Sequence, residues 1–157
     1  MKRYKSCSLI ILLLLASALQ AYAHISRNMF MLSNLNTDNG LSSPRVYSIV
    51  EAEDGAMWIS TKRGVDRYNG QQVTNYTLYT EMPYSDARGR SIKLTKDAQH
   101  LIYAYDNKGK VYIYDKRKDT FVLKCNLQKI LGGSIVLNEL LVDEKGNFWL
   151  AMDRGIY

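Results

Sequence analysis

The chain has 157 residues, of which 46% are hydrophobic and 23% are charged, with only two prolines and ten glycines. This composition excludes a disordered or collagen-like protein, and the length favours about one domain. The formal net charge is +6 at pH 7, but residues 1–23 hold three of the 21 basic residues and none of the acidic ones. The remainder therefore carries +3, an ordinary surface charge that gives no indication of a nucleic-acid partner.

The amino terminus has the three parts of a signal peptide. A basic start over residues 2–5 precedes an apolar run over residues 8–19, and Ala21-Tyr22-Ala23 then provides the small residues at which signal peptidase cuts. The alternative interpretation is a membrane anchor, but the apolar run is shorter than the ~20 residues of a spanning helix. We therefore expect cleavage before His24 and export to the periplasm. The 134-residue product would retain Cys125 as its only cysteine, so no internal disulfide could form.

An internal repeat is the strongest feature of the remaining sequence. Its landmarks are a glycine, a tryptophan and a second glycine, which recur 91 residues apart as Gly55, Trp58 and Gly64 in one copy and Gly146, Trp149 and Gly155 in the other. A degenerate copy lies between them over residues 92–111, offset by 43 to 45 residues from the first. Leu101 and Ile102 lie in the region of its missing tryptophan. The period is therefore about 45 residues.

Each repeat unit predicts four short strands joined by tight turns that contain Asp-Gly, Arg-Gly or Asn-Gly. In the first unit the strands are expected at Val46–Glu51, Met57–Thr61, Val65–Tyr68 and Val73–Tyr76. In the second they are expected at Ser91–Thr95, Leu101–Tyr105, Val111–Asp115 and Thr120–Cys125. The second and third strands of this unit show no polar alternation, which indicates burial on both faces.

Four antiparallel strands in a unit of this length, with a tryptophan in the second strand, are typical of a propeller blade. A single β-sandwich also has short, evenly spaced strands, but it does not require the motif to recur. We therefore predict an all-β fold, an incomplete β-propeller of about two and a half blades, preceded by the signal peptide. The expected parts are a lead-in over residues 24–44 and repeats over residues 45–157, with blades at about 45–80, 88–128 and 135–157. The outer face of each terminal blade is expected to be uncovered, and the isolated product is expected to be poorly stable or prone to aggregate.

The segments 38–49 and 54–70 together carry a distinctive pattern, which begins Asp-Asn-Gly-Leu-Ser and continues through Asp-Gly-Ala-Met-Trp-Ile. This pattern resembles the opening of the periplasmic sensor of Bacteroides-type hybrid two-component systems, which is built from two-component regulator propeller repeats. The resemblance spans roughly residues 28–157 and is strongest in 38–70 and 144–156. It is specific for the repeat and less specific for the output domain.

The resemblance implies a parent with two seven-bladed propellers, an immunoglobulin-like domain, a membrane helix, a histidine kinase, a receiver and a DNA-binding module. Such sensors detect oligosaccharides released from complex glycans, and the parent is expected to be a homodimer anchored in the inner membrane. The printed sequence contains no kinase motif, nucleotide loop or receiver carboxylates, and it ends at Tyr157 within a repeat. We therefore expect an amino-terminal fragment of a sensor, or a truncated reading frame, whose partners are the remaining blades.

The residues that could carry chemistry favour no enzyme and no cofactor. The two histidines, His24 and His100, have no metal-ligand spacing. Glu53-Asp54 and Asp143-Glu144 are paired acids, but they fall at predicted turns and lack the pattern of a calcium loop. The serines Ser42, Ser43 and Ser60 lack a nucleophile elbow.

Three arginines and the aromatic residues are the remaining candidates for ligand contacts. Arg45, Arg63 and Arg154 lie in or beside inter-strand segments that can face the channel or surface of a propeller, where anionic or hydroxyl-rich ligands would bind. Trp58 and Trp149 could stack on sugars, although their equivalent places favour packing between blades, and the twelve tyrosines also suit half-buried strands. The predicted function is ligand sensing. The alternatives are a protein-interaction or structural propeller and, less favoured, a propeller enzyme acting on polysaccharide.

Overall fold

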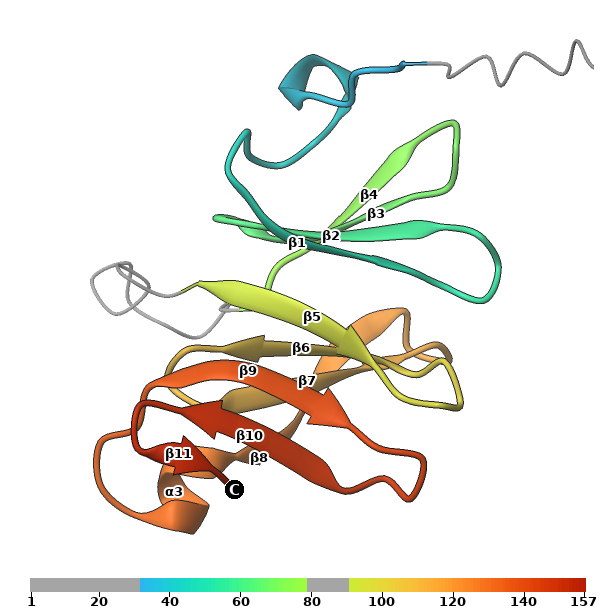
Figure 1. Cartoon of the computed structure of the whole chain (residues 1–157). Helices are drawn as coiled ribbons and strands as arrows, with labels where there is room; N and C mark the ends of the chain where they lie inside the picture. Colours follow the sequence, from blue (N-terminus) through green and yellow to red (C-terminus); the bar gives the residue numbers. More distant parts are fainter. Residues whose placement is uncertain (1–31, 79–90) are drawn as a thin grey trace, which may run out of the picture. The chain divides into compact units, whose positions relative to one another are not determined.

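The computed structural model describes residues 32–78 and 91–157. The predicted signal peptide and the cleavage site before His24 lie outside these residues. The chain divides into two units, Met1–Asn34 and Leu35–Tyr157, and the second contains all the strands described below. Its strands form three antiparallel sheets (Figure 1). No helix in the described ranges has the length and apolar character needed to cross a bilayer.

The first sheet has four strands in sequential order. They are β1 (Val46–Glu51), β2 (Met57–Thr61), β3 (Gly64–Tyr68) and β4 (Val73–Tyr76). The sequence predicted these bounds to within one residue. The turn into β3 depends on Gly64, whose φ is 151° and whose position leaves no room for a side chain, because an added Cβ would lie 2.2 Å from the Tyr76 carbonyl oxygen.

The second sheet repeats this order with β5 (Ile92–Lys96), β6 (Ile102–Asp106), β7 (Lys110–Asp115) and β8 (Thr120–Asn126). Every strand lies within one residue of its predicted bounds. All five residues of β6 are buried, as its lack of polar alternation indicated. In β7 only Val111 and Tyr112 are buried, whereas the rest of the strand is half-buried, so the burial on both faces expected for this strand is found over only part of it.

The third sheet follows a one-turn helix, α3 (Leu127–Leu131), whose first turn is capped by the Asn126 side chain. It contains β9 (Leu137–Val142), β10 (Phe148–Met152) and the short β11 (Gly155–Ile156), in the order β11-β10-β9. Trp149 in β10 pairs with Leu141, as Trp58 in β2 pairs with Val50. The two tryptophans therefore lie at equivalent places in equivalent strands, as the repeat predicted.

The turn hydrogen bonds correct the alignment of the degenerate middle copy. The same backbone bond closes the turn from Ala52 to Ala56, from Asp97 to Leu101 and from Asp143 to Asn147. The first and second copies are therefore offset by 45 residues at this turn, and the 43-residue alignment of residues 92–98 was wrong. Tyr103 occupies the place of Trp58, whereas Leu101 and Ile102 precede it. The signal was hidden because His100, with φ 62°, replaces the turn glycine of the other copies.

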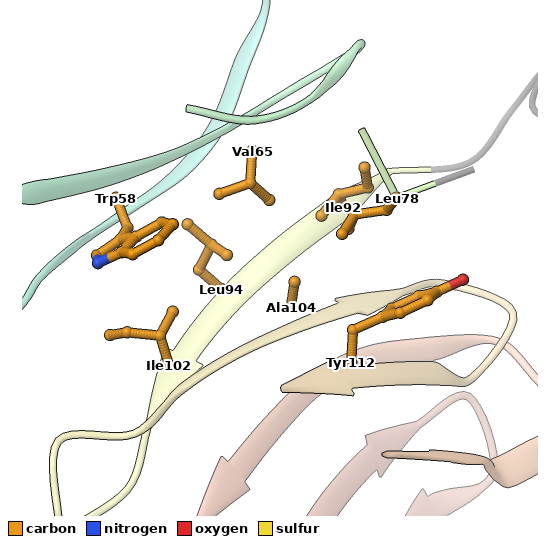
Figure 2. Close-up of a cluster of buried hydrophobic side chains, with 8 residues drawn as sticks. All are labelled: Trp58, Val65, Leu78, Ile92, Leu94, Ile102, Ala104 and Tyr112. Carbon is orange, nitrogen blue, oxygen red and sulfur yellow. The ribbon is translucent and has the colours of Figure 1, made fainter. Parts of the chain in front are cut away.

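The sheets stack through their first strands, with β5 in contact with β1 on one side and with β9 on the other (Figure 1). One buried cluster lies between the first two sheets, with Trp58, Val65, Leu94, Ile102 and Ala104 among its members (Figure 2). A second joins the second and third sheets. The fold is an incomplete β-propeller, with two four-stranded blades and three strands of a third.

The outer face of the first blade is not bare, contrary to the expectation from sequence. The lead-in makes a 3-10 turn at Thr37–Asn39 and then buries Leu41 and Ser43, each 6% exposed, before it enters β1. The backbone N–H and the hydroxyl of Ser42 both donate to Asp66, at 2.8 Å each. A local segment thus covers part of a face that sequence periodicity could not assign to it.

Candidate functional site

Both ends of the stacked sheets carry turns from every blade. The loop end comprises the β2–β3, β6–β7 and β10–β11 turns, and the turn end comprises the β1–β2, β5–β6 and β9–β10 turns. Equivalent turns lie at the same end because the strands of each sheet follow the same antiparallel order. Ligand contacts on propellers are to be sought at these ends, since the strands themselves are occupied with sheet and blade packing.

The arginines singled out in the sequence lie at the loop end. Arg63 and Arg154 occupy the β2–β3 and β10–β11 turns, and the Arg45 carbonyl accepts a hydrogen bond from Lys62 in the first of these. All three side chains are exposed. Their guanidinium groups make no ion pair or hydrogen bond within the described ranges. The structure therefore brings Arg45 next to the Arg63 turn and places Arg154 two blades further on.

Arg154 also lines a cavity of about 380 Å³ at the loop end. The cavity is formed by the segment after α3 and by the β10–β11 turn, and its wall includes Ile135, Met152, Asp153 and Tyr157. The wall therefore combines apolar side chains with one cation and one anion. A cavity of this size has room for a small ligand.

Aspartates organise the turn end, among them Asp143, which the sequence predicted to be a solvated turn residue. Asp97 accepts from the backbone of Gln99 and Leu101, and its second oxygen accepts from the Tyr103 hydroxyl at 3.1 Å. Burial, followed by this bond, raises the pKa of Tyr103 to about 12. The buried Asp97 carboxylate therefore holds both the β5–β6 turn and the Tyr103 side chain in place.

Asp143 does the same in the third blade. It accepts from the backbone N–H groups of Lys145 and Asn147, and its second oxygen accepts from the Trp149 indole at 3.1 Å. Hydrogen bonds from Asn147 and Trp149 lower the pKa of Asp143 to about 2. Asp97 and Asp143 lie at the same position of the repeat, 46 residues apart. Aligning the second and third copies with this offset would have identified them from the sequence.

In the first blade this position is Ala52, and the turn is closed differently. Asp54, two residues later, accepts from the Ala56 backbone at 3.1 Å and forms an ion pair with Arg67. These bonds lower the pKa of Asp54. The Arg67 guanidinium lies over the Trp58 ring, 5.7 Å from its centre. A groove of about 290 Å³ opens here between the first and second blades.

The other candidates from the sequence have structural partners or remain isolated. Ser60 is fully buried and exchanges a hydrogen bond of 2.9 Å with the Ser48 hydroxyl. His100 is exposed in the β5–β6 turn, while His24 lies outside the described residues. No group of three or more histidine, cysteine, aspartate or glutamate side chains in the described ranges is placed to hold a metal ion.

Trp58 and Trp149 differ in their packing. Trp58 is 2% exposed and contacts the rings of Tyr76, Tyr114 and Phe121, with centroid distances of 5.3, 4.6 and 5.5 Å. This agrees with packing between blades. Trp149 is 52% exposed, because no described residue covers that face of the third sheet.

The comparisons with known proteins fit this repeat architecture. Residues 40–63, which run from the lead-in glycine through β1 and β2, match the family model of the two component regulator propeller. The chain contains a two component regulator propeller repeat. No curated protein sequence matches the chain.

Solved structures with the same fold come from B. thetaiotaomicron. The extracellular domain of BT4673, described as a hybrid two component system, has a TM-score of 0.63 and 19% identity, covering 81% of this chain and 16% of its own. A second structure of that domain, described as a one component system, has a TM-score of 0.63 and 18% identity. The match covers 83% of this chain and 17% of the other. The extracellular domain of BT3049, described as a hybrid two component system, has a TM-score of 0.53 and 20% identity. The match covers 79% of this chain and 15% of the other. The propeller repeats of this chain thus span about one sixth of each of those chains.

Proposed function

We propose that this chain is the non-catalytic, ligand-sensing part of an extracytoplasmic two-component sensor. The match of residues 40–63 to the two component regulator propeller is the observation that carries the proposal. Fold neighbours described as extracellular domains of two component systems support it. The proposed location is the periplasm, reached through the signal peptide over residues 1–23. The parent would continue into further blades, a membrane anchor and a histidine kinase, and would act as a homodimer.

The proposed ligand is an oligosaccharide released from a glycan, bound at the loop end. Arg45, Arg63 and Arg154 would contact it, since each offers an exposed guanidinium with no partner in the described ranges. A guanidinium presents five N–H donors in a fixed planar arrangement, which suits carboxylates and vicinal hydroxyl groups. Arg45 and Arg63 lie at one turn and could act on the same sugar unit. No cofactor is part of the proposal.

Thermal-shift screening of the chain against oligosaccharide pools, followed by calorimetric titration of the best pool, tests this function. We expect a saturable rise in melting temperature with at least one pool. The double variant Arg45→Ala plus Arg63→Ala should weaken binding by tenfold or more. Arg117→Ala, an exposed arginine in the β7–β8 turn at the opposite end, is the matched control and should bind normally. The proposal fails if no pool binds or if the control loses affinity equally.

A further inference from the structure

The three turns at the turn end differ in the residue that begins them. In the second and third blades an aspartate, Asp97 or Asp143, begins the turn and accepts a hydrogen bond from the aromatic residue of the next strand. In the first blade the equivalent residue is Ala52. The side-chain carboxylate is therefore missing from one of three otherwise equivalent places.

The missing carboxylate leaves the Trp58 indole N–H without an acceptor among the described residues. Trp58 is 2% exposed, and its indole N–H makes no hydrogen bond to any residue in the described ranges. The equivalent indole of Trp149 donates to Asp143 at 3.1 Å. The Trp58 indole nitrogen is not sealed from solvent, and Trp58 lines the adjacent groove, so a ligand there can accept from this N–H. Figure 2 shows the Trp58 nitrogen at the edge of the buried cluster, on the side away from Val65 and Leu94.

The groove between the first two blades occupies the space beside this donor. Ala52 and Trp58 both line it, and its volume of about 290 Å³ suits a small molecule. Leu101, 45% exposed, adds an apolar wall. The backbone N–H of Ala56, whose equivalents donate to Asp97 and Asp143 in the other blades, donates to Asp54 here, whereas the indole N–H has no such partner.

Charged side chains from both blades line the groove. Lys116 and His100 line it from the second blade, and both side chains are exposed with no partner in the described ranges. On the first blade Asp54 is neutralised by its ion pair with Arg67, while Glu53 is exposed at the rim. Lys116 and Glu53 line the groove from different blades, and neither makes an ion pair within the described ranges. Lys116 is therefore available to pair with a ligand carboxylate.

We propose that this groove binds a small carboxylate-bearing ligand, whose carboxylate replaces the missing aspartate and accepts a hydrogen bond from the Trp58 indole. Lys116 supplies the opposing charge, and the apolar part of the ligand contacts Leu101. The site lies at the opposite end of the blades from the arginines. It depends on neither the oligosaccharide nor the sensor role proposed above.

Nuclear magnetic resonance of the two indole N–H groups tests this site in the full ¹⁵N-labelled chain. Benzoate serves as the carboxylate probe and benzamide as its uncharged counterpart, both at constant ionic strength. We expect benzoate to move the Trp58 cross-peak saturably and to leave the Trp149 cross-peak, already bonded to Asp143, unchanged. Benzamide should bind at least tenfold more weakly. An unmoved Trp58 cross-peak, or equal shifts with both probes, overturns the proposal.

Two matched substitutions add a carboxylate at different turns. Ala52→Asp restores the side chain found in the other blades, and it should abolish benzoate binding and raise the melting temperature. Ala98→Asp adds the same charge at an exposed place in the neighbouring β5–β6 turn and should leave benzoate affinity within twofold. Lys116→Ala should weaken it several-fold and provides the test if Ala52→Asp does not fold. Unaltered affinity in both Ala52→Asp and Lys116→Ala contradicts the assignment.

Discussion

The first and third blades place equivalent residues in opposite environments. Trp58 and Val65 in the first blade are 2% and 0% exposed, whereas Trp149 and Ile156 in the third are 52% and 76% exposed. The strand pairing is the same in both. The repeated sequence therefore determines strands and turns within a blade, while burial of a blade depends on the next sheet in the stack.

The two outer faces also differ. The lead-in covers part of the first blade through Leu41 and the Ser42–Asp66 hydrogen bonds. On the third blade Leu141, Trp149 and Ile156 form an apolar face that no described residue covers. Native repeat arrays cover or cap such faces with polar residues. In the first and second blades, the face that corresponds to this apolar face packs against the next sheet.

The largest expected effect of this difference is self-association of the chain. The apolar face of the third blade, together with an open strand edge, should drive concentration-dependent oligomers in sedimentation velocity. Leu141→Lys plus Ile156→Lys should shift the chain toward monomer. Ile130→Lys, which changes an equally exposed residue on α3, should not. A monodisperse parent chain with a sharp, cooperative thermal transition would contradict this prediction.

The next largest effect is a difference in the free energy of unfolding between substitutions of Trp58 and of Trp149. Trp58→Ala removes a side chain packed against three aromatic rings and should lower the free energy of unfolding by about 3–5 kcal/mol. Trp149→Ala removes a half-exposed side chain with one hydrogen bond and should cost less than about 1.5 kcal/mol. Urea unfolding followed by circular dichroism measures both. Equal losses would mean that the third blade is covered in solution.

The difference between local and long-range signals explains what the sequence predicted. The strands of the first two blades were found within one residue, because glycine turns such as the one at Gly64 fix hairpins locally. The lead-in cover was missed because the contact between Ser42 and Asp66 joins residues 24 apart, with no periodic pattern. Propensity and periodicity contain no information about such a contact.

The candidate sites were predicted unevenly for the same reason. The arginine-bearing turns follow from the repeat itself, so their common end could be expected from the sequence. The groove at Trp58 could not, because it arises from a residue that is absent from one copy. Only the correct alignment, in which Ala52 matches Asp97 and Asp143, makes that absence visible. The 43-residue alignment placed Asp97 opposite Asp54 and concealed it.

The anchoring of the lead-in gives a smaller but specific effect. Asp66 is fully buried and accepts from Ser42 and from the Asn75 amide, at 2.8 Å each. Asp66→Ala leaves these donors unsatisfied and should cost about 2–3 kcal/mol. Asp153→Ala, which removes an exposed aspartate with one side-chain bond in the third blade, should cost less than about 0.5 kcal/mol. Hydrogen exchange over residues 36–45 should rise only in the first variant. Unchanged exchange there would show that other contacts hold the lead-in.

The smallest expected effect is a gain in stability at the turn of the second blade. His100 has φ 62°, whereas Gly55 and Gly146 hold this place with φ 76° and 80° in the other blades. A non-glycine residue is strained in this region, and glycine adopts it freely. His100→Gly should therefore stabilise the chain by about 0.5–1 kcal/mol, seen as a higher urea midpoint with an unchanged slope. Gln99→Gly, in the same turn but without positive φ, should instead destabilise it. A loss of stability in His100→Gly would show that the histidine side chain contributes more than the strained backbone costs.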